Sequence, residues 1–227
     1  MNSFDWKNLI DPLFYIHFDV NGIKMGIYIV LFIVFAETGL FAGFFLPGDS
    51  LLFLAGIYNR ELIENIFFID SDFINVFLLS LFVALSGILG NIVGYWFGAK
   101  RGYSLYNKQD SFWFKKKYLI QSKDFFEKHG GRAIIFARFL PIFRTFAPIV
   151  AGIVSMEKKK FMFYNVISSF LWSFTLIFAG HYLYGFLLKQ YQIDLKQHIE
   201  LIVIGLVFLT LSPVLLKLAK KSPSVEE

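Results

Sequence analysis

The chain has 227 residues, of which 56% are hydrophobic and 20% aromatic, and its 22 Lys and Arg against 17 Asp and Glu give a formal net charge of +5. This composition is too apolar for an ordinary soluble domain and predicts an integral membrane protein. The basic residues concentrate in loops beside apolar stretches, as expected near anionic lipid, which argues against nucleic-acid binding. Without cysteine, the sequence offers no disulfide, thiol nucleophile or thiolate metal site.

Residues 1–25 are predicted to form a helix that lies at the membrane interface. Acidic residues balance Lys7 and Lys24, so the segment lacks the basic start of a cleaved signal peptide and is expected to stay on the mature protein. Its apolar side chains recur near helical spacing, at Phe4, Trp6, Leu9, Ile10, Leu13 and Phe14.

The first long apolar stretch, residues 26–58, is too long for one membrane crossing and too short for two, because a crossing helix takes about 20 residues. Pro47, Gly48, Asp49 and Ser50 interrupt it with a turn sequence that also offers a helix N-cap. These features predict a reentrant hairpin, which enters the bilayer and returns to the same side.

Three later stretches, residues 73–99, 161–188 and 199–216, are long and apolar enough to predict transmembrane helices. Between the first two lies residues 133–154, a stretch about one crossing long. It is broken by Pro141 and Pro148 and carries Arg138 and Arg144, so it predicts a second reentrant hairpin.

Loop charges predict the orientation. Residues 100–132 hold nine basic and three acidic residues and are expected to form a cytoplasmic amphipathic segment, whereas acids dominate residues 59–72, which should lie outside. A full crossing by residues 133–154 would put three lysines, 158–160, outside, and a hairpin keeps them in the cytoplasm. The N-terminus is then outside, and the tail, residues 220–227, is cytoplasmic.

The two predicted hairpins share a pattern. Phe45-Leu46-Pro47 leads to Ala55-Gly56, Phe139-Leu140-Pro141 leads to Ala151-Gly152, and a transmembrane helix follows each. The sequence therefore predicts an all-α membrane protein in which residues 26–219 form a single domain. That domain is an inverted repeat of reentrant hairpin plus transmembrane helix, with an additional C-terminal transmembrane helix and an N-terminal interfacial helix.

Four charges lie deep in apolar stretches: Glu37 and Asp49 in the first hairpin, Arg138 and Arg144 in the second. At about 2.5 to 3.5 kcal/mol per central charge, they must face one another or a wet cavity. Two arginines suit the phosphate of a lipid headgroup, which they bind in bidentate fashion. Burial favours a neutral Glu37 and a nearby arginine favours its carboxylate, so this group suits proton coupling. Purely structural ion pairing, and helix capping by Asp49, are the alternatives.

The run from Phe136 to Thr145, FARFLPIFRT, with Pro148 and Ala151-Gly152, resembles the signature of the DedA family, also called the SNARE-associated or VTT domain. Further matches are Glu37-Thr38-Gly39, Leu46-Pro47-Gly48-Asp49, the glycines at 90, 94, 98 and 102, Asn165 and Trp172, whereas Asn91 stands where many members have Asp. The resemblance covers residues 26–190. It implies a bacterial inner-membrane protein, related to lipid scramblases and associated with proton-dependent recycling of undecaprenyl phosphate, in which the four buried charges are functional.

These inferences predict a flippase for undecaprenyl phosphate or a similar lipid phosphate, and not an enzyme. Arg138 and Arg144 would hold the phosphate, while Glu37 and Asp49 would exchange protons and gate the site. The alternatives are a non-selective phospholipid scramblase, a proton-coupled small-ion or osmolyte antiporter, and a lipid phosphatase. The four scattered histidines form no ligand set, so neither a metal nor another cofactor is expected. The sequence is compatible with a homo-oligomer.

Overall fold

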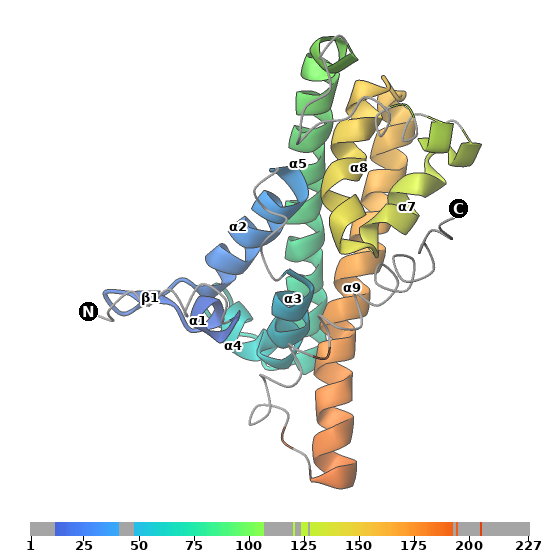
Figure 1. The fold of residues 1–227 in the computed structure, drawn as a ribbon. Helices are drawn as coiled ribbons and strands as arrows, with labels where there is room; N and C mark the ends of the chain where they lie inside the picture. The colour runs from blue at the N-terminus through green and yellow to red at the C-terminus, as the bar shows by residue number, and fades with distance from the viewer. Residues whose placement is uncertain are drawn as a thin grey trace, which may run out of the picture.

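The computed structural model describes residues 12–40, 48–106, 120, 124–126, 128–192, 194 and 205, and nearly all of them are helical (Figure 1). The predicted C-terminal helix over 199–216 and the tail lie outside the described residues, Gly205 excepted. Pro47 and most of the predicted cytoplasmic segment over 100–132 lie outside them as well.

Two long helices form the centre of the fold. α5 (Asp72–Tyr106) and α9 (Lys158–Tyr191) run side by side and are both long and apolar enough to cross a membrane (Figure 1). At about 1.5 Å of rise per residue, each exceeds the roughly 30 Å of a bilayer's hydrocarbon core. They contain the predicted segments 73–99 and 161–188, so the helical prediction is confirmed there.

Each predicted hairpin is a pair of short helices. The first consists of α2 (Gly26–Gly39) and α3 (Gly48–Ile57), and the second of α7 (Arg132–Arg138) and α8 (Pro141–Ile153). The longest has 14 residues, which rise about 21 Å and cannot cross a bilayer alone. The helix α4 (Asn59–Ile63), which the sequence did not predict, follows α3.

The breaks at Gly48 and Pro141 are where the sequence placed them, but the break at Pro148 is wrong. Gly48 begins α3 and Pro141 begins α8, after Leu140 adopts an extended backbone. Pro148, by contrast, lies inside a continuous α8. A proline removes one backbone hydrogen bond, and here packing of α8 on α5 holds the helix together, with Gly94 leaving room beside the proline ring.

The N-terminal prediction also needs correction. Within residues 12–25 the chain forms only a five-residue helix, α1 (Pro12–Ile16), followed by an antiparallel hairpin of β1 (Asp19–Val20) and β2 (Ile23–Lys24). Asn21 and Gly22 between the strands both have positive φ, which is the backbone of a type I′ turn. The extension of the predicted helix to residue 25 is therefore wrong, because the Asn-Gly pair favours a hairpin, while residues 1–11 of that prediction lie outside the described residues.

The α3–α9 crossing is built on two glycines. A Cβ atom on Gly56 would lie 2.2 Å from the backbone oxygen of Ile177, and one on Gly180 would lie 2.0 Å from that of Phe53. Each helix thus presents a glycine to the backbone of the other, and no larger residue fits without moving a helix. Small residues bring membrane helices together in this way.

The α5–α8 crossing repeats this arrangement. A Cβ atom on Gly98 would lie 2.0 Å from the backbone oxygen of Ile149, and one on Gly152 would lie 2.1 Å from that of Tyr95. On each of the four helices, the glycine lies three positions after the residue whose backbone oxygen the glycine of the partner helix approaches. The second half of each hairpin therefore packs, through the same contact, on the long helix that follows the other hairpin.

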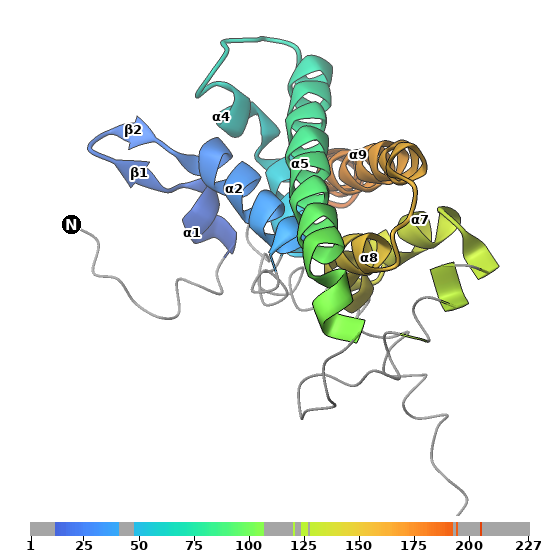
Figure 2. The ribbon, with the colours of Figure 1, turned by 90° about the horizontal axis from the view of Figure 1, so that it is seen from above.

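The main apolar core lies between α2, α3 and α5, and it includes Trp172 and Ile177 of α9. Seen from above, α1, α2 and the β-hairpin lie on one side of α5, while α7 and α9 lie on the other (Figure 2). Many large apolar side chains point outward, as a lipid-facing surface requires; on the long helices they include Phe77, Leu89, Trp96, Phe163, Leu171 and Tyr182.

Candidate functional site

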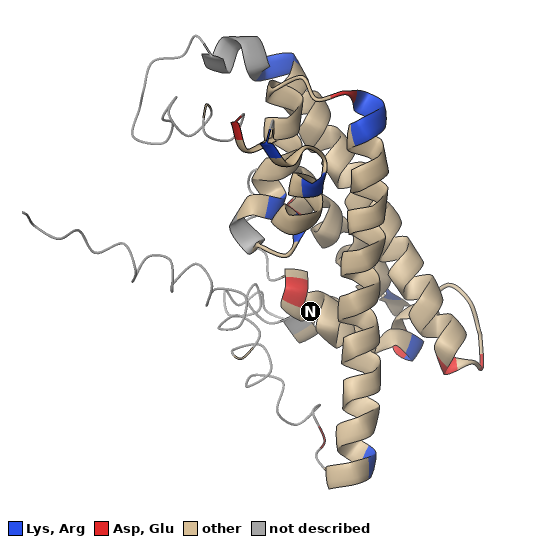
Figure 3. Cartoon of the chain, turned by 90° about the vertical axis from the view of Figure 1, so that its right-hand side faces the viewer, with Lys and Arg blue, Asp and Glu red and all other residues tan. Residues whose placement is uncertain are grey.

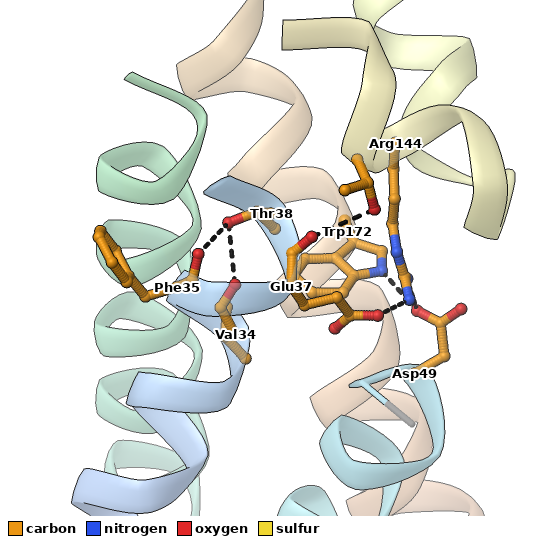
Figure 4. Close-up of polar contacts among 8 residues, drawn as sticks. Val34, Phe35, Glu37, Thr38, Asp49, Arg144 and Trp172 are labelled. Atoms are coloured by element: carbon orange, nitrogen blue, oxygen red, sulfur yellow. Dashed lines mark hydrogen bonds and ion pairs between the residues drawn. The ribbon is translucent and has the colours of Figure 1, made fainter. Parts of the chain in front are cut away.

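Three of the four predicted charges meet at one point (Figure 4). Arg144 of α8 donates from Nη2 to Oε1 of Glu37, near the end of α2, and from Nη1 to Oδ1 of Asp49, in the first turn of α3. The Arg144 and Glu37 side chains are 6% and 1% exposed and that of Asp49 is 16% exposed. One buried guanidinium from the second hairpin thus joins two carboxylates of the first.

Local sequence holds this ion cluster in place. Gly48 has no side chain, and a Cβ atom there would overlap Oε2 of Glu37. This carboxylate therefore lies against the N-terminal end of α3, where a helix dipole favours negative charge. Thr145 donates from Oγ1 to the backbone oxygen of Glu37 at 3.1 Å, which ties α8 to the end of α2.

Asp49 is more than a helix cap. α3 begins one residue earlier, at Gly48, so Asp49 is already inside the first helical turn. Its Oδ1 accepts hydrogen bonds from Arg144 and, at 2.9 Å, from the indole Nε1 of Trp172. The carboxylate therefore holds α3 to both α8 and α9.

Trp172 of α9 organises both arginines. Its buried ring lies 4.8 Å from the guanidinium carbon of Arg138 and 5.4 Å from that of Arg144. A cation over an indole face is attracted by the ring quadrupole, and more strongly where water is excluded. The sequence singled out Trp172 only through the family resemblance, and the structure places its ring beside both predicted phosphate ligands.

Arg138, the fourth charge, has a different environment. It ends α7 and is 3% exposed, yet no carboxylate of the described residues lies within salt-bridge distance. Its Nε and Nη2 are buried without a hydrogen-bond partner. Burying a cation without a counter-charge is costly. The prediction that the four charges face one another therefore holds for Arg144 and the two acids, while Arg138 stands apart.

A polar layer lies beside Arg138, and the sequence named its asparagines only through the family resemblance, without placing them at this site. The side-chain amides of Asn91 on α5 and Asn165 on α9 lie 2.6 Å apart, and Ser169 donates to Asn165 at 3.3 Å. The signal was present as polar or small residues four positions apart, Gly87 with Asn91 and Asn165 with Ser169, since such pairs share one face of a helix. Polar groups inside membrane helices are expensive and are commonly functional.

This arrangement has groups that can bind an anion. Arg138 offers buried, unused N–H donors, which an oxyanion can accept. Within the described part of the chain, no group of three or more His, Asp and Glu side chains is placed to hold a metal.

Comparison with known proteins identifies the family. The VTT domain matches residues 32–182, a range that contains all four buried charges and Trp172. The chain belongs to the DedA family of membrane proteins.

Its relatives in this family match over most of the chain. It is 35% identical over 212 residues to Protein DedA of Escherichia coli (strain K12), covering 90% of each chain. It is 34% identical over 207 residues to an uncharacterized membrane protein of Mycobacterium leprae, covering 91% of this chain and 86% of the relative. Inner membrane protein YghB of Escherichia coli (strain K12) is 33% identical over 148 residues, 64% of this chain and 63% of the relative. No solved structure matches.

Family membership confirms the membrane-protein prediction made from composition and the resemblance made from the FARFLPIFRT run. This DedA-family chain brings together Glu37, Asp49 and Arg144 and stacks Arg138 on the same tryptophan. The predicted roles of these residues rest on that geometry.

Proposed function

We propose that this DedA-family protein is a flippase that moves undecaprenyl phosphate, or a similar lipid phosphate, across the bacterial inner membrane without acting as an enzyme. The observation that carries the proposal is Arg138, a buried guanidinium in which two nitrogen atoms lack a hydrogen-bond partner and which has no described carboxylate partner. A phosphate monoester supplies both the missing charge and the missing acceptors. The lipid tail would remain among the apolar side chains.

Arg144 would be the second phosphate ligand, available only when its ion pairs with the two carboxylates dissociate. Glu37 and Asp49 both hold it in the present structure. Oε2 of Glu37 is buried without a hydrogen-bond partner and is the atom at which a proton would add. Protonation there would weaken the ion pair with Arg144 and let the phosphate bridge both arginines, which couples transport to protons.

In this proposal the lipid crosses the membrane along two reentrant hairpins that form an inverted repeat. Support comes from the four short helices, none long enough to cross, and from the two matching glycine crossings. Basic residues gather at the end where α5 finishes and α9 begins, and the acids of residues 61–72 lie at the other end (Figure 3). By the positive-inside rule the first end is cytoplasmic, and the N-terminus is outside.

The test is transport by the purified protein in liposomes that carry labelled undecaprenyl phosphate in one leaflet, with and without an imposed pH gradient. We expect wild type to move the lipid faster with the gradient, and Arg138→Gln to abolish movement. Arg60→Gln is the matched control, because Arg60 is exposed on α4 and pairs with Glu64 and Asp70.

Three outcomes would redirect the proposal. Equal movement of many headgroups, without any effect of the gradient, would indicate a non-selective scramblase. Unchanged transport by Arg138→Gln would remove the phosphate-binding role. Release of inorganic phosphate from the lipid would indicate an enzyme.

A further inference from the structure

Arg144 contacts carboxylates, whereas Arg138 contacts the uncharged side chain of Asn91. Asn91 lies on α5, is 2% exposed, and its amide lies 2.5 Å from Nη1 of Arg138. A guanidinium only donates hydrogen bonds, so the amide oxygen must be the atom that faces it. In that orientation the amide nitrogen donates to the backbone oxygen of Thr38 at 3.3 Å.

The surroundings of Asn91 are shaped for the arginine. Gly87 lies one turn earlier on the same face of α5, and a Cβ atom there would lie 2.4 Å from Nη2 of Arg138. The missing side chain makes room for the guanidinium. Asn165 of α9 lies beside the Asn91 amide. The bond to the Thr38 backbone oxygen of α2 therefore fixes a neutral acceptor of α5 on one corner of the buried cation.

The neutrality of this acceptor matters. An amide oxygen orients the guanidinium through one hydrogen bond and supplies no counter-charge. A carboxylate in the same place would form the kind of ion pair that Glu37 and Asp49 form with Arg144. An incoming phosphate would then have to compete with it, as it must at Arg144.

We propose that Asn91 is the affinity-determining residue of the anion site: it positions Arg138 and, by being uncharged, leaves that arginine free for a phosphate monoester. The inference rests on the proposed lipid-phosphate function and adds an order to it. Arg138 is the arginine that binds first, because among the described residues it has no carboxylate partner to displace, and Arg144 follows when its ion pairs open.

The experiment measures binding of farnesyl phosphate to the full-length protein in phosphatidylcholine nanodiscs, with farnesol as the phosphate-free control. Asn91→Asp, which preserves shape, is expected to weaken binding at neutral pH by about tenfold or more, the effect of a competing charge-assisted pair. Asn91→Ala removes the amide without adding charge and is expected to stay within about threefold of wild type.

Lowering the pH distinguishes a competing charge from a misfolded site, because only the competing charge can be removed by protonation. Protonating the introduced carboxylate makes it neutral, so the ratio of Asn91→Asp to wild-type affinity should rise toward one as the pH falls. Glu37, Asp49, Arg144 and Arg138 are common to both proteins, and taking the ratio cancels their titration and that of the phosphate. Asn165→Asp places the charge one side chain further away and should give a smaller loss in the same direction.

The possible failures are distinct. If Asn91→Asp and Asn165→Asp bind as wild type does while Arg138→Gln loses binding, Asn91 does not set the affinity and the flippase proposal stands. If Asn91→Ala is as weak as Asn91→Asp at every pH, positioning and not charge is what matters, and this inference is overturned. If wild type prefers farnesyl phosphate to farnesol no more than Arg138→Gln does, both proposals fall.

Discussion

The hairpins α2–α3 and α7–α8 have the same architecture and opposite chemistry. Each is a pair of short helices joined by a break, and the second helix of each crosses a long helix through paired glycines. Yet the first contributes only acids to the buried cluster and the second only arginines. The packing is thus duplicated while the charges are divided, so the ion pairs form between hairpins and not within them.

The two arginines extend this comparison. Arg144 is compensated twice and holds α2, α3 and α8 together, whereas Arg138 faces a neutral amide and an indole ring. Structural stability should therefore depend on Arg144, and anion binding should depend on Arg138. Four predictions, taken from the largest effect on stability to the smallest, test this division and the duplicated packing.

Arg144→Gln should be the most destabilising change, by about 3 to 5 kcal/mol, because it leaves Glu37 and Asp49 buried without a cation. The measurement is the free energy of unfolding in mixed micelles. Adding Glu37→Gln and Asp49→Asn to the same protein should recover part of the loss. A stability equal to that of Arg60→Gln would show that the ion cluster is not structural.

Gly180→Ala and Gly98→Ala should each cost about 1 to 3 kcal/mol, since either new Cβ atom would lie 2.0 Å from a backbone oxygen and force two helices apart. The matched control is Gly185→Ala on α9, where a Cβ atom meets nothing within 4 Å. Similar losses at both crossings support a duplicated scaffold. A loss at one crossing alone would contradict it.

Trp172→Phe should have a smaller effect, about 1 to 2 kcal/mol. The substitution keeps an aromatic face near both guanidiniums but removes the Nε1 donor to Asp49. In the Asp49→Asn background, Trp172→Phe should lower the stability much less than it does in wild type. Thermal unfolding of the four proteins of this double-mutant cycle measures that coupling. Simple additivity would mean that the hydrogen bond does not hold the site.

Arg138→Gln should leave the free energy of unfolding unchanged or raise it slightly, because it removes a buried charge that forms an ion pair with none of the described carboxylates. The same protein should lose lipid-phosphate binding. This is the sharpest contrast with Arg144→Gln, and unfolding curves for the two variants under one condition are sufficient to measure it. Equal destabilisation by both would erase the distinction between the arginines.

The sequence by itself determined the parts of the molecule that depend on local patterns. Hydropathy found α5 and α9, the turn residues found the breaks before α3 and α8, and the rarity of charge in apolar stretches isolated Glu37, Asp49, Arg138 and Arg144. The Asn21-Gly22 hairpin was also readable locally, but the helix predicted from the apolar spacing of residues 4–14 was extended over it.

Tertiary structure alone decided which charges pair. Asp49 and Glu37 meet Arg144 across 95 and 107 residues of chain, and no spacing rule says that Arg144 takes both acids while Arg138 takes none. Packing likewise kept α8 continuous through Pro148 and brought Asn91 to Arg138. Composition determines that the buried charges need partners, because an unpaired charge in the membrane is costly. The crossing of helices through their glycines determines which residues those partners are.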